Sequence, residues 1–113
     1  MNKRILIAED ERSLIAIYRL MLGDRFDIIE ACNGEEAVEL FRSQRPDLTL
    51  MDIRMPVKNG DEAIAEILEI DGGAKIIAVT AYNYTEEQLG VPVLRKGFTS
   101  ADFLEAIGKL LED

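Results

Sequence analysis

Two kinds of apolar pattern alternate along this chain. Short runs that are apolar almost throughout occupy residues 4–8, 26–31, 48–52, 75–81 and 91–95. Between most of them, apolar residues recur three or four positions apart, which is the period of an amphipathic helix. Strands without polar alternation are covered on both faces, and a strand–helix repeat of this kind is typical of a doubly wound parallel sheet. The pattern therefore predicts a single α/β domain over residues 1–113, without a linker or an internal repeat.

The polar residues between these runs predict where the helices begin and end. A first helix is expected over residues 11–22, with Gly23 in place to end it. Asn33 with Glu36, and Asn59 with Glu62, have the three-residue spacing of a capping box, and Thr99 is expected to cap the last helix. The segment 82–90 has room for only a turn or two, so a fourth helix should be short or absent.

Composition and charge exclude several classes of function. The formal net charge of −9 argues against direct binding of nucleic acid, which needs clustered Lys and Arg. The chain has no His and a single cysteine, Cys32, so Cys/His zinc sites and His-dependent catalytic triads are excluded. No apolar run approaches the roughly 20 residues that span a bilayer. These features predict a protein of the reducing cytoplasm that does not enter a membrane.

Chemically active side chains follow four of the five predicted strands. Glu9 and Asp10 follow the first, Asp52 ends the third, Thr80 the fourth, and Lys96 comes after the fifth. In open α/β sheets the crevice at the carboxyl ends of the strands is where ligands bind. Three carboxylates meeting there would repel one another unless a cation lies among them, and an all-oxygen site suits Mg²⁺ or Mn²⁺. A carboxylate nucleophile, a divalent cation, an ammonium and a hydroxyl are together what accepting a phosphoryl group requires.

Each of these residues also has an ordinary structural interpretation. Asp52 alone is compatible with a turn that ends a strand, and Glu9 with a solvated acidic loop. Thr80 alone is compatible with a β-branched strand residue, and Lys96 with surface charge. The functional interpretation depends on their order along the chain and on their shared position at strand ends.

That ordered set resembles the receiver (response-regulator) domains of two-component signalling, the CheY-like family. The resemblance covers the whole chain and rests on Glu9-Asp10, Asp52 within MDIRMP, Asn59-Gly60, Thr80-Ala81 and Lys96. It implies a flavodoxin-like fold with a five-stranded parallel sheet in the order 2-1-3-4-5.

The resemblance also implies a role for each site residue. Asp52 resembles the phosphoacceptor and Asp10 a direct Mg²⁺ ligand. Glu9 resembles a ligand that acts on the metal through water, and Arg54 resembles the residue whose backbone carbonyl binds the metal. Thr80 with Ala81 resembles the phosphate-binding switch, and Lys96 the ammonium that pairs with the phosphate. The domain would catalyse only its own phosphorylation and dephosphorylation, and so would not be a turnover enzyme.

Two departures from the family pattern leave an alternative open. Gly97 stands where receivers usually carry a cis-proline after the lysine, and Val93 stands where they carry an aromatic that swings inward on activation. A pseudo-receiver, which binds proteins without being phosphorylated, is the alternative that these two residues favour. An aspartate-nucleophile phosphatase of the haloacid dehalogenase type is disfavoured, because Arg54 stands where those enzymes carry a second Asp.

The implied partners follow from the implied chemistry. The phosphoryl donor would be a phosphohistidine on a histidine kinase or a histidine phosphotransfer protein, and the output would be an unknown protein partner. The first helix, with Arg12 and Ile15 expected to be exposed beside the acidic pair, is the predicted partner face. With a reduced fourth helix and no inward-swinging aromatic, the domain is expected to be a monomer that signals through the loop 81–90.

Overall fold

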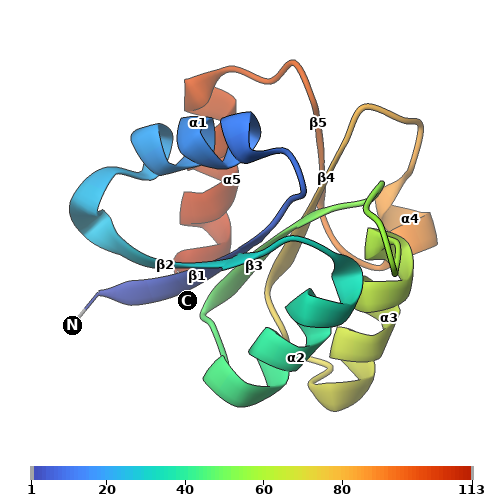
Figure 1. Cartoon of the computed structure of the whole chain (residues 1–113). Coiled ribbons are helices and arrows are strands. Elements are labelled where there is room, and N and C mark those ends of the chain that lie inside the picture. Colours follow the sequence, from blue (N-terminus) through green and yellow to red (C-terminus); the bar gives the residue numbers. More distant parts are fainter. Residues whose placement is uncertain (1, 113) are drawn as a thin grey trace.

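The fold is a five-stranded parallel sheet with helices on both faces, as Figure 1 shows. The computed structural model describes residues 2–112, so the first and last residues of the predicted domain lie outside it. The strand order is β2-β1-β3-β4-β5, which confirms the order implied by the resemblance. The strands are β1 (Lys3–Ala8), β2 (Phe26–Ala31), β3 (Leu48–Asp52), β4 (Ile76–Thr80) and β5 (Val93–Arg95).

The helices form two layers around this sheet (Figure 1). They are α1 (Arg12–Leu22), α2 (Gly34–Gln44), α3 (Gly60–Ile70), α4 (Glu86–Leu89) and α5 (Ser100–Leu111), with a short 3₁₀ turn over Gly23–Arg25. Helices α1 and α5 pack on one face, and α2 and α3 on the other. The α4 helix has only four residues and buries none of them, which confirms the prediction of a short fourth helix.

The sheet is buried because its central strands have no polar face. Every residue of β3 and of β4 is buried, as expected for apolar strands between two helical layers. One core lies between the sheet and α2 and α3, where Phe41 and Ile67 pack. The other lies between the sheet and α1 and α5, where Tyr18 and Phe103 pack.

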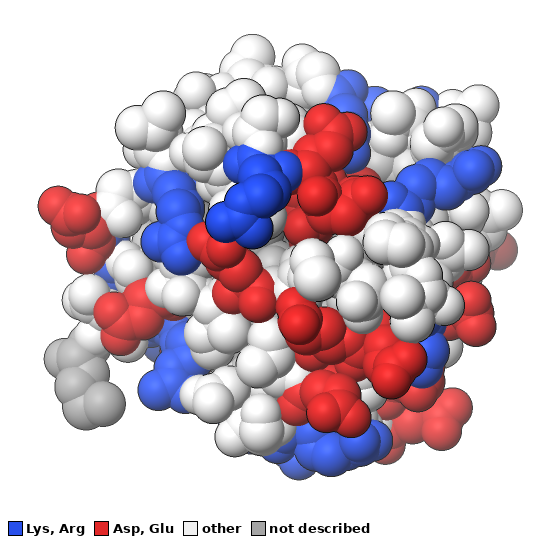
Figure 2. All heavy atoms as spheres, in the orientation of Figure 1, with Lys and Arg blue, Asp and Glu red and all other residues white. Residues whose placement is uncertain are grey.

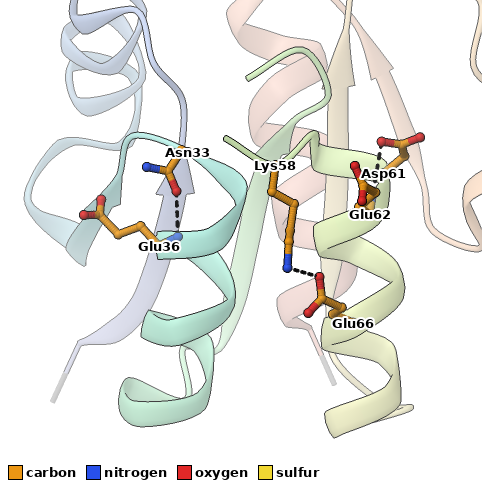
Figure 3. Close-up of polar contacts among 6 residues, drawn as sticks. All are labelled: Asn33, Glu36, Lys58, Asp61, Glu62 and Glu66. Atoms are coloured by element: carbon orange, nitrogen blue, oxygen red, sulfur yellow. Dashed lines mark hydrogen bonds and ion pairs between the residues drawn. The ribbon is translucent and has the colours of Figure 1, made fainter. Parts of the chain in front are cut away.

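The predicted capping interactions are present at two helices out of three. The Asn33 side chain accepts a hydrogen bond from the Glu36 N–H at 2.8 Å (Figure 3), and Thr99 forms a reciprocal capping box with Asp102. The capping box predicted at Asn59 was wrong, because the Asn59 side chain makes no capping bond. The backbone fixes the start of α3 instead, since the Gly60 N–H donates to the carbonyl of Ile53 at 2.7 Å.

The predicted exposure of Ile15 on α1 was also wrong. Ile15 is 5% exposed and belongs to the core, whereas Ile17 and Leu20 are 47% and 82% exposed. Arg12 is exposed as expected. The apolar surface that α1 offers is therefore centred on Ile17 and Leu20.

Carboxylates dominate the charged surface, in line with the net charge. Figure 2 shows acidic side chains gathered over α2 and α3, where Lys58 forms an ion pair with Glu66 (Figure 3). None of the helices within residues 2–112 combines the length and the apolar character needed to cross a membrane.

Candidate functional site

Strand register brings the predicted site residues to one edge of the sheet. Ala8 on β1 pairs with Met51 on β3, so Glu9 and Asp10 leave the sheet beside Asp52. On the other side, Asp52 pairs with Val79, which places Thr80 one residue beyond it. Lys96 follows β5 directly, and its N–H donates to the Thr80 carbonyl at 2.8 Å. All five residues therefore lie at the carboxyl ends of adjacent strands.

The side chains converge around Asp52. Asp52 is 5% exposed, Glu9 and Thr80 are 1% exposed each, and Asp10 is exposed. The Lys96 ammonium lies 3.1 Å from Asp52 Oδ1 and 3.8 Å from Glu9 Oε1. One ammonium is thus shared between two buried carboxylates.

This arrangement perturbs the ionisation of three groups. Burial raises the pKa of Glu9 from 4.5 to about 7, opposed by a hydrogen bond from the Glu11 N–H and by Lys96. Burial also raises the pKa of Asp52, although the hydrogen bond and charge of Lys96 act in the opposite direction. For Lys96 burial lowers the pKa, but its interactions with Asp52 and Glu9 outweigh burial and raise it above the usual value. Lys96 is therefore a cation at physiological pH, and it offsets only part of the cost that burial imposes on ionising Glu9 and Asp52.

The carboxylates fit the divalent cation that the family implies. Each of Glu9, Asp10 and Asp52 offers one oxygen, and these three oxygens lie within 4.8 Å of one another. Glu9 Oε1 is buried and accepts no hydrogen bond from the described residues. Buried polar atoms rarely lack a hydrogen bond, so this oxygen, which has only the ion pair with Lys96 at 3.8 Å, can also accept a cation or its bound water. Three carboxylate oxygens are a donor set that Mg²⁺ accepts. Glu9, Asp10 and Asp52 would hold the ion.

The turn after Lys96 has a backbone conformation that favours glycine. The peptide bonds among residues 2–112 are all trans, and Gly97 adopts a φ of 101°, a conformation that side-chain-bearing residues rarely adopt. The ammonium nevertheless lies within hydrogen-bonding distance of Asp52. The glycine turn therefore leaves Lys96 in contact with Asp52. Val93, the other departure, lies half-buried in β5 and has no ring to swing inward.

Thr80 connects the site to the loop that follows β4. Its hydroxyl oxygen accepts a hydrogen bond from the Tyr82 N–H at 3.0 Å. The Arg54 guanidinium lies 4.3 Å from the centre of the Tyr82 ring, and Arg95 donates to the Asn83 side chain at 2.6 Å. The exposed Ala81 lies between Thr80 and Tyr82. Besides these polar contacts, the loop is held by Tyr84 and Leu89, which are partly buried against the core, and none of its side chains is fully buried.

Two features of the site were missed by sequence reasoning. The Arg54 and Tyr82 side chains meet across 28 positions of sequence, which no local pattern indicates. Tyr18 is buried in α1 and stacks with Phe98, which follows Lys96-Gly97 by one residue. The only sequence signal for this second contact was an aromatic residue immediately after the unusual glycine.

The structure brings together, at the strand ends of a parallel α/β domain, the three carboxylates, the threonine and the lysine on which the resemblance to receiver domains rests. The family model described as the response regulator receiver domain matches residues 5–107. The chain belongs to this family, whose members are signalling modules of two-component systems and not turnover enzymes.

Individual relatives support the same assignment over most of the chain. Chemotaxis protein CheY of Halobacterium salinarum is 42% identical over 88 residues, covering 77% of this chain and 73% of that protein. Protein CcdB of Bacillus subtilis is 38% identical over 116 residues, covering 96% and 97%. The crystal structure of response regulator protein TrrA from Thermotoga maritima in complex with Mg²⁺ and BeF has a TM-score of 0.86 and 34% identity, covering 96% of this chain and 99% of that one.

Mg²⁺ should stabilise the folded protein. A bound ion would relieve repulsion among Glu9, Asp10 and Asp52, and binding to the folded state alone would add stability by mass action. At one hundred times the dissociation constant the gain is about 2.7 kcal/mol, which is roughly 10 °C in Tm for a domain of this size. Thermal unfolding with EDTA and with Mg²⁺ measures it. Asp10→Asn should abolish the effect, whereas Glu39→Gln, which removes an exposed carboxylate of α2, should preserve it. Equal melting of the wild type in EDTA and Mg²⁺ would show that the three carboxylates share no ion.

The metal-free protein should lose stability as the pH rises from about 4.5 to about 7. Within this range the folded state keeps the Glu9 proton, because its pKa is about 7, while the unfolded state has already lost it at an ordinary pKa of 4.5. The folded state then binds more protons than the unfolded state, so the free energy of unfolding falls with pH and levels off above 7. Urea titrations in EDTA at pH 5 and pH 8 test the sign, and Glu9→Gln should flatten the difference. A metal-free protein that is more stable at pH 8 would contradict the assignment.

Proposed function

We propose that the chain accepts a phosphoryl group from a phosphohistidine donor onto Asp52, with Mg²⁺ bound, and that this changes its binding to a protein partner. The observation that carries the proposal is the buried Asp52 carboxylate with the Lys96 ammonium 3.1 Å from Oδ1 and two further carboxylates beside it. An aspartate with a purely structural role would not require an ammonium and two further carboxylates around it.

The transfer is a substitution at phosphorus. An oxygen of the ionised Asp52 attacks the phosphorus atom, the P–N bond to the donor imidazole breaks, and the imidazole nitrogen keeps the electron pair. Bound Mg²⁺ would neutralise negative charge on the phosphoryl oxygens. Lys96 supplies a fixed positive charge 3.1 Å from Asp52 Oδ1, and Thr80 offers a hydroxyl donor. The backbone carbonyl of Arg54 as a metal ligand and Ala81 as part of the phosphate-binding switch belong to the same proposal.

Intact mass after incubation with Mg²⁺ and phosphoramidate tests the proposal. The wild type should gain the mass of one phosphoryl group, Asp52→Asn should gain none, and Asp61→Asn, which alters a carboxylate of α3 outside the site, should behave like the wild type. Absence of a gain in the wild type would favour the pseudo-receiver. The turn at Lys96-Gly97 supports phosphorylation over the pseudo-receiver alternative, because the Lys96 ammonium lies beside Asp52.

Activation should order the loop 81–90 without producing a dimer. The α4 helix is too short to complete the usual output surface, whereas the Tyr82 N–H is bonded directly to the Thr80 hydroxyl that would bind the phosphoryl group. Hydrogen exchange with and without beryllofluoride should show protection gained within residues 81–90, and light scattering should show one protomer in both states. A dimer induced by beryllofluoride, or protection confined to residues 99–112, would mean that the output face lies on β5 and α5.

The donor protein is proposed to contact α1, which lies beside the site. Its exposed apolar residues are Ile17 and Leu20. A phosphotransfer protein or a histidine kinase is the partner class that this chemistry requires.

A further inference from the structure

Three aromatic rings stack beneath the turn that carries Lys96. The rings of Tyr18 and Phe103 lie 5.4 Å apart with planes inclined by 8°, and those of Phe98 and Phe103 lie 5.5 Å apart and inclined by 11°. Tyr18 and Phe98 are 6.5 Å apart. We call these three residues the aromatic stack; it joins α1, α5 and the turn between β5 and α5.

The turn depends on support from its neighbours, because Gly97 gives it none. Gly97 has a φ of 101°, and a Cβ added there would meet no atom within 4 Å. On the strand side the backbone is fixed by the hydrogen bond from the Lys96 N–H to Thr80. On the helix side Thr99 begins the capping box of α5. Between these points, Phe98 is the residue whose side chain enters the protein, and it does so by stacking on Phe103.

We infer that the aromatic stack sets the position of the Lys96 ammonium, the role that a rigid proline after the lysine would otherwise serve. Phe98 and Tyr18 are thus positioning residues for phosphoryl transfer, acting through Lys96. Phe98 holds the turn, and Tyr18 closes the stack from α1, where it is 2% exposed. The expected effect of the aromatic stack on the rate of phosphoryl uptake rests on the proposed function. Its expected effect on the position of Lys96 rests on the structure alone.

The ring of Tyr18, and not its hydroxyl, contributes to positioning Lys96. The hydroxyl is buried and has no hydrogen-bond partner among the described residues. Tyr18→Phe removes the hydroxyl and keeps the stack, so the rate of phosphoryl uptake should not change. Tyr18→Leu keeps apolar volume and removes the ring, so uptake should slow.

The test measures phosphoryl uptake from phosphoramidate in wild type, Phe98→Leu, Lys96→Ala and the double variant. Displacing a catalytic charge by about 1 Å can cost up to a hundredfold in rate, so we expect Phe98→Leu to slow uptake roughly ten- to a hundredfold. In the Lys96→Ala background the same substitution should have no further effect, because the group it positions is gone. A merely structural role would slow both backgrounds by the same factor, and that result would overturn the inference.

A packing control separates positioning from loss of core. Phe41 is 3% exposed and packs on the opposite face of the sheet, away from the turn. Phe41→Leu should lose stability as Phe98→Leu does, yet take up phosphate at the wild-type rate when both are measured well below their melting temperatures. Equal slowing in Phe41→Leu would again overturn the inference.

A second measurement keeps the inference testable if the wild type takes up no phosphate at all. That outcome would reject the proposed function. The role of the aromatic stack would then be tested by the free energies of unfolding of the same four proteins in urea. If Phe98 positions Lys96 beside Asp52, the losses of stability in Phe98→Leu and Lys96→Ala are non-additive. Additive losses would show that the stack and the ammonium are independent.

Discussion

Gly60→Ala should destabilise the protein by about 3 kcal/mol or more, the upper end of the range for overpacking a well-packed interior. A Cβ built on Gly60 would lie 1.9 Å from the carbonyl oxygen of Asp52 and 2.8 Å from the Cα of Ile53. Both neighbours are backbone atoms, so no side-chain rotation relieves the clash. The Gly60 N–H also donates to the Ile53 carbonyl, which holds α3 against the end of β3. Either α3 or the strand end that carries the phosphoacceptor must move.

Thermal unfolding measures this effect, and α5 offers a matched control. A loss of 3 kcal/mol corresponds to roughly 10 °C in Tm. Gly108 is exposed within α5, and a Cβ there would meet nothing within 4 Å, so Gly108→Ala should stabilise the helix by about 1 kcal/mol. The same methyl group should therefore act with opposite sign at the two positions. A Gly60→Ala protein that melts within a degree or two of the wild type would show that α3 can shift without cost.

The layers of the fold could be predicted from the sequence because its apolar strands have no polar alternation. β3 and β4 read as buried strands and are buried at every residue. The expected exposure of Ile15 on α1 was wrong, and helical spacing already argues against it. Ile15, Tyr18 and Leu22 are three and four positions apart, so they share one face of the helix, and all three are buried against the sheet.

The capping motif failed at Asn59 because another side chain accepts the bond that the cap would form: the Glu62 N–H donates to Asp61 Oδ1 at 3.0 Å. Asn59 has the spacing of a cap, yet its side chain makes no capping bond. The start of α3 is also held by the bond from the Gly60 N–H to the Ile53 carbonyl at the end of β3. Asn33 has the same spacing and does cap α2.

The site was predictable to the extent that it depends on strand ends. Parallel register places Glu9, Asp52, Thr80 and Lys96 at one edge whatever the loops do. The placement of the Lys96 ammonium was not predictable, because it depends on the backbone conformation of the following Gly97, which only the three-dimensional structure shows.

Lys96→Ala and Thr80→Ala should impair different steps. The Lys96 ammonium lies 3.1 Å from Asp52 Oδ1, where negative charge on the transferred group must be neutralised. Removing one such preorganised partner costs about a hundredfold in rate or more, so Lys96→Ala should slow phosphoryl uptake to that extent. Thr80 Oγ1 already accepts a bond from the Tyr82 N–H, so its removal disconnects the loop while leaving the charges around Asp52 in place.

Two measurements on each variant separate these roles. Thr80→Ala should take up phosphate from phosphoramidate within a few-fold of the wild-type rate, yet show no gain of hydrogen-exchange protection in residues 81–90 with beryllofluoride. Lys96→Ala should fail in the uptake measurement, and Lys109→Ala, which removes an exposed lysine of α5, should behave like the wild type in both. The tyrosine amide left unpaired by Thr80→Ala should also exchange faster even without the phosphate mimic, because its acceptor is gone. Equal loss of uptake in Thr80→Ala and Lys96→Ala would mean that the hydroxyl acts in the transfer itself and that the loop is moved by another contact.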